Sequence, residues 1–203
     1  MKNKWWPASV FQSSTSGLIA FVLLMSEVVL VILSWLLSAT RMEGVRSLLS
    51  SEGIRWFFGH FTEMIASPLL VWLLLGLSAW GCVQASGFHL PLVSYRDKVA
   101  FRVSLVFLII YVVIIVLLTC LPHAILLSAT GHLFPSAFSR SLVPVVAFGV
   151  CLASVTFGLM SGRIHSFADI VSSLSRGIAH GAPLIILYVL FIQFYESLRF
   201  VFG

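Results

Sequence analysis

The sequence predicts an all-α integral membrane protein with about five transmembrane helices and a short interfacial helix before the second. Apolar residues make up 60% of the 203-residue chain, compared with about 45–50% in globular proteins. Charged residues make up only 9%, compared with about 25%. So few charged side chains cannot cover the surface of a soluble domain of this length. The composition therefore excludes a soluble enzyme, a disordered chain and a disulfide-stapled secreted domain.

The first predicted span covers residues 17–39 and follows the aromatic pair Trp5-Trp6. A transmembrane helix needs about 20 mostly apolar residues to cross about 30 Å of hydrocarbon. This run is too long for a cleaved signal peptide, and its end is a poor cleavage site. We therefore expect a retained helix.

The second predicted span covers residues 68–84, and a shorter helix precedes it. Ser50-Ser51-Glu52 is typical of a helix start with an acidic residue in the first turn. Residues 53–61 mix aromatic and polar side chains too densely for a bilayer core. We expect them to form a short helix at the membrane interface that breaks near Ser67-Pro68.

The remaining predicted spans cover residues 103–121, 142–160 and 182–195. The third and fourth carry no charge. The fifth is short, but a helical pattern extends back to about Phe167. The whole chain, residues 1–203, is expected to form a single transmembrane domain.

The distribution of Lys and Arg predicts the orientation. With the N-terminus inside, seven of the twelve basic residues fall on the cytoplasmic side, and the loop 122–139 on the outer side is nearly free of charge. We expect a multi-pass protein of the bacterial inner membrane with a cytoplasmic N-terminus. The basic residues are scattered beside apolar runs, which favours contact with the lipid bilayer and excludes nucleic acid as a partner.

Glu27 is the main candidate for an intramembrane polar site, because it lies near the centre of the first span. An acidic side chain there faces the protein interior or water, since burial in lipid costs about 2.5–3.5 kcal/mol. Either it binds a proton or cation, or it only hydrogen-bonds a neighbouring helix. Polar residues of other spans that can lie near it are Ser78, Tyr111, Ser154 and Gln193. The predicted site consists of Glu27, Tyr111, Arg176 and His180.

Small residues recur every four positions in two places, a spacing that lets helix backbones approach closely. They serve either packing within the chain or an oligomer interface. The predicted helix-packing residues are Ser154, Gly158, Gly162, Gly177 and Gly181, with Ser173 preceding the last two.

The histidines and cysteines match no metal-ligand spacing, and the chain has no nucleophile elbow or phosphate-binding glycine loop. We therefore expect no metal, no cofactor and no enzymatic activity.

Several segments, in order along most of the chain, resemble the aminobenzoyl-glutamate transporter (AbgT) family. Residues 48–57 resemble the segment before that family's second transmembrane helix, and residues 67–69, 76–81 and 85–88 continue the likeness. The likeness resumes at residues 101–102, 142–144, 157–163 and 168–170 and extends to about residue 194.

The resemblance covers only the family's scaffold helices. Family members have two inverted halves, each with a re-entrant hairpin that carries substrate-site residues, and this chain lacks both hairpins. The resemblance therefore implies a scaffold or accessory subunit of a membrane complex, working as a homo-oligomer or with a second membrane subunit. The alternative is a minimal homo-oligomeric transporter or exporter of aminobenzoyl-glutamate-like or other small anionic molecules, proton-coupled through Glu27.

Overall fold

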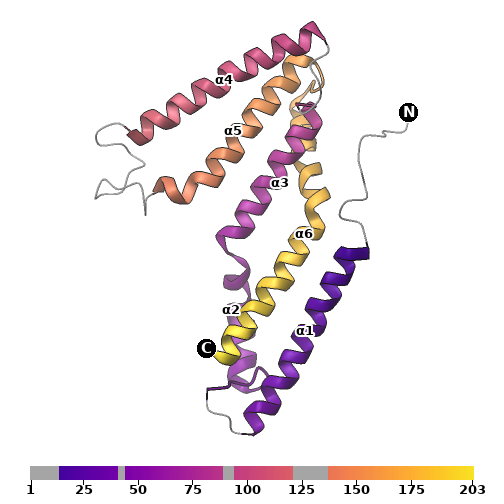
Figure 1. Cartoon of the computed structure of the whole chain (residues 1–203), viewed down its shortest axis with the longest axis vertical. Helices are drawn as coiled ribbons and strands as arrows, with labels where there is room; N and C mark the ends of the chain where they lie inside the picture. The colour runs from indigo at the N-terminus through magenta and orange to yellow at the C-terminus, as the bar shows by residue number, and fades with distance from the viewer. Residues whose placement is uncertain (1–13, 41–43, 89–93, 121–136) are drawn as a thin grey trace. The chain divides into compact units, whose positions relative to one another are not determined.

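The computed structural model describes residues 14–40, 44–88, 94–120 and 137–203 (Figure 1). These residues form six helices and, within the described ranges, no strand. The helices are α1 (Ser14–Ala39), α2 (Ser51–Ile65), α3 (Pro68–Ser86), α4 (Tyr95–Cys120), α5 (Ala137–Ser161) and α6 (Phe167–Phe202).

Five of these helices, all except α2, are long and apolar enough to cross a membrane. This confirms the predicted all-α fold with five candidate spans and a shorter helix before the second. The predicted fifth span is part of a much longer helix, since α6 continues through Pro183 for 36 residues. At about 1.5 Å per residue α6 is about 54 Å long, whereas the hydrocarbon core is about 30 Å thick.

The chain divides into two compact units, and α3 and α6 each contribute to both. Unit 1 contains the described residues up to Val71 together with Gly181–Gly203. Unit 2 contains Trp72–His180. The single transmembrane domain stays a prediction.

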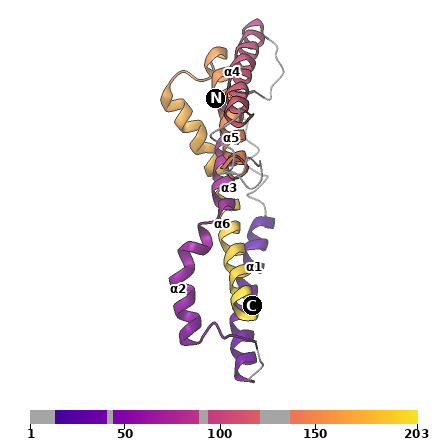
Figure 2. The same ribbon diagram turned by 90° about the vertical axis from the view of Figure 1, so that its left-hand side faces the viewer.

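In unit 1, α1 and α2 both run beside the second half of α6 (Figure 2). Glu27 of α1 contacts Ser197 of α6, and farther along both helices Leu30 belongs to the same apolar cluster as Val201. The contacts advance together, so α1 and this half of α6 are parallel. Their N-terminal ends therefore lie on the same side of unit 1.

The core of unit 1 consists of Leu30, Leu48, Phe200 and Val201. Trp56 of α2 stacks on Phe200 with ring centroids 4.3 Å apart. Most of the apolar surface of α1 faces outward, because buried residues make up only 6% of its most apolar window. The core is thus small, as expected where lipid can cover the remaining apolar surface.

The predicted start of α2 is confirmed. Ser50 is the N-cap, and its hydroxyl accepts a hydrogen bond from the Gly53 amide at 3.0 Å. Serine at this position satisfies one of the amide groups that have no partner at a helix start. The location of α2 at a membrane interface stays a prediction.

The predicted break after α2 is also present. Helix α2 ends at Ile65, so the carbonyls of its last turn lack the amide donors of a continuing helix. The hydroxyl of Tyr188 on α6 donates to the Ile65 carbonyl at 3.2 Å and is hydrogen-bonded to Ser67. α2 is antiparallel to α6, because Trp56 lies by Phe200 and Ser67 lies by Tyr188.

In unit 2, α3 and α6 cross where two glycines face each other. A Cβ atom on Gly177 would lie 2.8 Å from the nitrogen of Gly81 and would collide with the Leu77 carbonyl. Real Cβ atoms do not approach other atoms this closely, so only glycine fits at either position. Helix α5 joins this contact through Cys151, which is hydrogen-bonded to Cys82 of α3.

The α4 and α5 helices of unit 2 lie side by side (Figure 1). The buried Ser104 hydroxyl donates to the Ala153 carbonyl at 2.8 Å. Only 6% of the most apolar window of α4 is buried, compared with 33% for α5. Helix α4 therefore leaves most of its apolar side chains uncovered by the described part of the protein.

Candidate functional site

Glu27 lies near the middle of α1, as predicted. It is 13 residues after the first residue of the helix and 12 before the last, or about 18–20 Å from either end. Its Oε1 atom accepts a hydrogen bond of 2.7 Å from the Ser197 hydroxyl on α6. This bond ties the first helix to the last within unit 1.

The Ser197 hydroxyl also connects Glu27 to a third polar side chain. Gln193 lies one turn earlier on α6, and its Nε2 donates to Ser197 Oγ at 3.3 Å. Ser197 is fully buried and Gln193 is only 9% exposed. Glu27, Ser197 and Gln193 form one hydrogen-bonded chain, which we call the Glu27 triad.

The Glu27 triad leaves two acceptors without a donor. Within the described part of the protein, Glu27 Oε2 and Gln193 Oε1 are the buried side-chain atoms that have no hydrogen-bond partner. Buried polar atoms without a partner are rare, because each costs about 1–3 kcal/mol. Both of these unpaired atoms belong to the Glu27 triad, so one explanation has to account for both.

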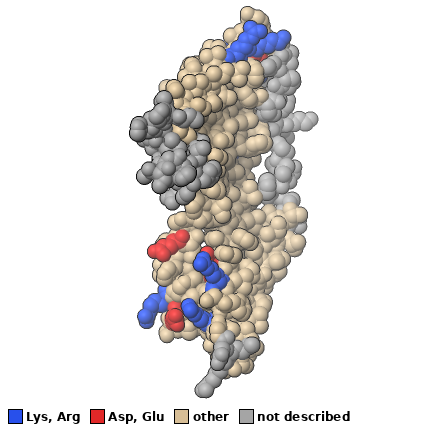
Figure 3. Space-filling view, turned by 60° about the vertical axis from the view of Figure 1, so that its left-hand side comes forward, with Lys and Arg blue, Asp and Glu red and all other residues tan. Residues whose placement is uncertain are grey.

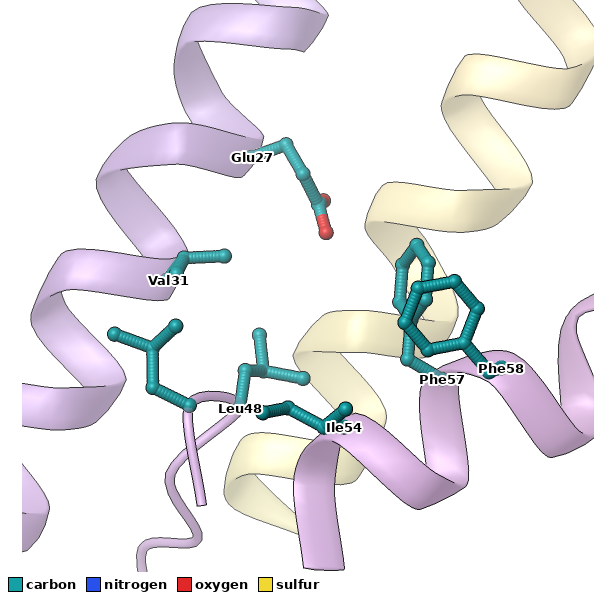
Figure 4. A pocket seen from close by; sticks show the side chains of 7 residues that line it. Glu27, Val31, Leu48, Ile54, Phe57 and Phe58 are labelled. Atoms are coloured by element: carbon teal, nitrogen blue, oxygen red, sulfur yellow. The ribbon is translucent and has the colours of Figure 1, made fainter. Parts of the chain in front are cut away.

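A cavity of about 140 Å³ lies beside Glu27 (Figure 4). Apart from Glu27 its walls are apolar, and α2 supplies three of them, Ile54, Phe57 and Phe58. The others are Val31 of α1 and the pair Leu48 and Leu49. The carboxyl group therefore lies in a setting that offers it almost no polar partner besides Ser197.

Tyr111 contacts α5 rather than the other predicted site residues. Its hydroxyl donates to the Val145 carbonyl at 2.9 Å, and its ring packs against Phe148. A Cβ on Gly149 would lie only 3.1 Å from this ring. Tyr111 also lines an apolar cavity of about 460 Å³ bounded by α3, α4 and α5.

Arg176 and His180 lie one turn apart on an exposed part of α6. The His180 ring nitrogen Nδ1 is 3.1 Å from the Arg176 carbonyl. Both residues and Tyr111 belong to unit 2, whereas Glu27 belongs to unit 1. A common site of these three residues with Glu27 stays a prediction.

Of the predicted packing residues, Gly177 occupies a close contact between helices, where it meets Gly81. Ser154 is buried, and a Cβ on Gly158 would lie 2.5 Å from the Ile164 side chain in the segment between α5 and α6. Gly181 is also buried. The sequence pattern did not single out Gly81, although its side of the α3–α6 crossing is equally tight.

Gly162 has a different role from the predicted one. It follows Ser161, the last residue of α5, and its φ of +75° is a left-handed conformation that favours glycine. The amides of Arg163 and Ile164 both bond to the Gly158 carbonyl. Gly162 therefore ends α5 and does not line its face.

Arg163 is a connecting residue that the sequence reasoning missed. Its guanidinium donates to the carbonyls of Ser86 and Gly87, at 2.9 and 3.2 Å, at the end of α3. It also lies 3.5 Å from Asp97 at the start of α4 and over the Phe157 ring of α5. A cation at a helix C-terminus satisfies free carbonyls and the helix dipole.

A second arginine repeats this arrangement, since Arg96 Nε donates to the Met160 carbonyl near the end of α5 at 3.1 Å. Figure 3 shows a group of basic side chains at one end of the molecule, and three basic residues lie in the first turns of α4. Arg96, Lys98 and Arg102 are exposed there. The only signal for these roles was a basic residue next to a helix end.

Among the described residues, no group of three His, Cys, Asp or Glu side chains is arranged to hold a metal ion. Comparison of the chain with models of known protein families, with curated proteins and with solved structures finds no match.

Proposed function

We propose that the chain is a multi-pass protein of the bacterial inner membrane that serves as a scaffold or accessory subunit, without enzymatic activity. The N-terminus is cytoplasmic in this proposal. The parallel course of α1 and the second half of α6 supports an odd number of spans, because helices that cross in the same direction have an odd number of crossings between them. The cytoplasmic side of the N-terminus rests on the distribution of Lys and Arg. The exposed Arg96, Lys98 and Arg102 then face the cytoplasm.

The observation that carries the scaffold role is the uncovered apolar surface of α1 and α4. Buried residues make up 6% of the most apolar window in each. A second protomer or another membrane subunit can pack on these helices. In contrast, the polar side chains of unit 2 serve contacts between its own helices, as Ser104, Tyr111 and Arg163 do.

The resemblance of the sequence to the scaffold helices of aminobenzoyl-glutamate transporters supports the same role. In that family these helices form the inner scaffold through which the dimer forms. The segments that carry the resemblance belong to the part of those transporters that assembles, and none of them belongs to a substrate-binding hairpin.

The test is the mass of the complex extracted gently from native membranes, measured by native mass spectrometry. We expect a homo-oligomer or a second polypeptide at fixed stoichiometry. A monomer under all mild extraction conditions would overturn the scaffold role.

A tryptophan scan along α4 provides the matched control. Replacing Val106, Ile110 or Val113 with Trp keeps the helix apolar. Lipid can still surround the larger side chain, whereas a closely packed partner helix has no room for it. We expect one face of α4 to lose assembly and another to tolerate Trp. Uniform tolerance around the helix would indicate that α4 faces lipid on all sides.

A second candidate function, a minimal homo-oligomeric transporter of small anionic molecules, rests on the Glu27 triad. A membrane-embedded acid with polar partners suits proton coupling. Replacing Glu27 with Gln should abolish flux if this is the function. Unchanged flux or drug resistance in that variant would remove the transporter and leave the scaffold.

A further inference from the structure

We propose that the Glu27 triad is an intramembrane proton-binding site in which the carboxyl group of Glu27 carries the proton. This inference deepens the second candidate function. Like the transporter function, the proton site requires α1 to cross the membrane, but it does not require transport.

The first argument is the hydrogen-bond count. With Glu27 as a carboxylate, the Ser197 hydroxyl is its single donor, and both Glu27 Oε2 and Gln193 Oε1 remain buried without a partner. One proton on Glu27 turns an unsatisfied charged acceptor into a donor. The chain then contains both a new donor and an acceptor, Gln193 Oε1, that needs one.

The second argument is that the carboxyl group has no polar ligand besides Ser197. Glu27 Oε2 is buried, and the adjacent cavity, which the Glu27 side chain lines, has no other polar wall from which a water or a metal ion could be held. The missing partner is therefore a hydrogen on the carboxyl group itself.

The third argument is the absence of a compensating cation in the described part of the protein. No Lys, Arg or His nitrogen there pairs with Glu27. The residues that face the carboxyl from α2 and from the segment before it are apolar. An unpaired carboxylate in such a setting is far more costly than the neutral acid.

The charged and titratable groups of the neighbouring elements point elsewhere. Arg46 lies over the Phe200 ring, and the His60 ring bonds to the Trp56 carbonyl. Tyr188 bonds to Ile65 and Ser67. The others are exposed or half-buried without a contact to Glu27, namely Glu52, Arg55 and Glu63 on α2 and Tyr195, Glu196 and Arg199 on α6.

The cavity gives the proton site a chemical signature. Its volume is about 140 Å³. A protein cavity of about 150 Å³ is known to bind benzene, and a cyclohexyl ring of dicyclohexylcarbodiimide is similar in size to benzene. Protonated carboxyl groups in apolar surroundings react with this reagent: the proton moves to a reagent nitrogen and the carboxyl oxygen bonds to the central carbon, which gives an O-acylisourea. The acyl group then moves from that oxygen to a reagent nitrogen, so that its C–O bond breaks and a C–N bond forms. The resulting N-acylurea retains every atom of both reactants.

The experiment uses the full chain in lipid nanodiscs and two readouts. Infrared difference spectra between the wild type and Glu27→Gln should contain the carbonyl band of a protonated carboxyl group at neutral pH. Mass spectrometry after treatment with dicyclohexylcarbodiimide should locate a gain of one whole reagent molecule at Glu27. Above the pH at which half of the Glu27 carboxyl groups have lost their proton, each further pH unit should reduce the labelling of Glu27 by about tenfold.

Glu63→Gln is the matched control, because Glu63 is exposed on α2. This variant should leave the infrared band and the labelling of Glu27 unchanged. In the unaltered protein, a water-soluble carbodiimide should label Glu63 in preference to Glu27. Gln193→Leu should shift the band, because the protonated acid loses its acceptor. The labelling of the unaltered protein needs no variant, so it stands even if a substitution disturbs folding.

A carboxylate signal for Glu27 at neutral pH overturns the proposal. So does equal labelling of Glu27 by the water-soluble reagent, since that marks a water-exposed carboxyl group. A protonated Glu27 combined with unchanged flux in Glu27→Gln keeps the proton site and removes the transporter. The scaffold role is unaffected by either result.

Discussion

In unit 2, α3 and α6 approach until the backbones of Gly81 and Gly177 face each other, whereas in unit 1 α1 is tied to α6 by the hydrogen bond from Ser197 to Glu27. The first contact depends on shape and tolerates no side chain. The second depends on polar groups in apolar surroundings. Because lipid removes the hydrophobic drive between helices, both solutions replace it, one with close packing and one with hydrogen bonds.

The largest effect is expected from adding a side chain where Gly81 of α3 and Gly177 of α6 meet. Gly177→Leu places carbon atoms against the backbone of α3, which cannot move aside. We expect a loss of stability of about 3 kcal/mol or more, or failure to accumulate. Thermal unfolding in detergent measures it.

Gly76→Leu is the control for this prediction, because nothing lies within 4 Å of a Cβ at Gly76 on the same helix α3. We expect little change in the unfolding temperature. Equal losses in both variants would mean that the crossing is not the cause.

Removing the cation that joins three helices of unit 2 comes next. Arg163→Ala leaves the carbonyls of Ser86 and Gly87 without their donor, so we expect a loss of about 1.5–3 kcal/mol in the free energy of unfolding. Arg163→Lys should fall between, because an ammonium group cannot reach both helix ends in fixed geometry.

Asp97→Asn separates the ion pair from the carbonyl contacts. The pair is 3.5 Å long, so this variant should cost less than about 1 kcal/mol. A larger loss from Asp97→Asn than from Arg163→Ala would contradict the assignment.

A smaller effect tests the break between α2 and α3 in unit 1. Tyr188→Phe removes the hydroxyl that bonds to the Ile65 carbonyl and Ser67, with an expected loss of about 1 kcal/mol. Tyr195→Phe is the matched control, since Tyr195 is exposed on the same half of α6. Denaturant unfolding of both variants checks the difference, and similar losses would contradict the contact.

The smallest effect is the coupling within the Glu27 triad. A double-mutant cycle with Glu27→Gln and Ser197→Ala should give a coupling energy of about 0.6 kcal/mol and at most about 1.7, as for other hydrogen bonds between membrane helices. The amide of Gln can still bond to Ser197, which keeps the coupling small. Additive losses would show that the two side chains act independently.

The fold followed from the sequence because apolar runs of sufficient length have one stable form in a membrane, the helix. The start of α2 at Ser50 and its break before Pro68 were equally readable, since both are set by neighbouring residues. The start of α6 at Phe167 was readable as well, but its end at Phe202 was not. Glu196 and Arg199 interrupt the apolar pattern after residue 195, although a charged side chain does not end a helix.

The sequence indicated two of the three residues of the Glu27 triad. Glu27 stood out as an acid among apolar residues, and Gln193 was among the polar residues that can lie near it. Ser197, which joins them, lies two residues beyond the predicted fifth span, so nothing in the local pattern indicated it. The grouping of Tyr111, Arg176 and His180 with Glu27 rested on residue type alone and stays a prediction.

The sequence by itself determined the number of helices, the candidate spans, the caps at α2 and the presence of an acid inside α1. These properties depend on residues close together in the chain. Only the tertiary structure decided that Gly81 opposes Gly177, that Arg163 reaches the end of α3 and that Ser197 meets Glu27. These pairs are distant in sequence, and many alternative pairings of apolar helices bury similar surface, so the steric fit and the hydrogen bonds select among them.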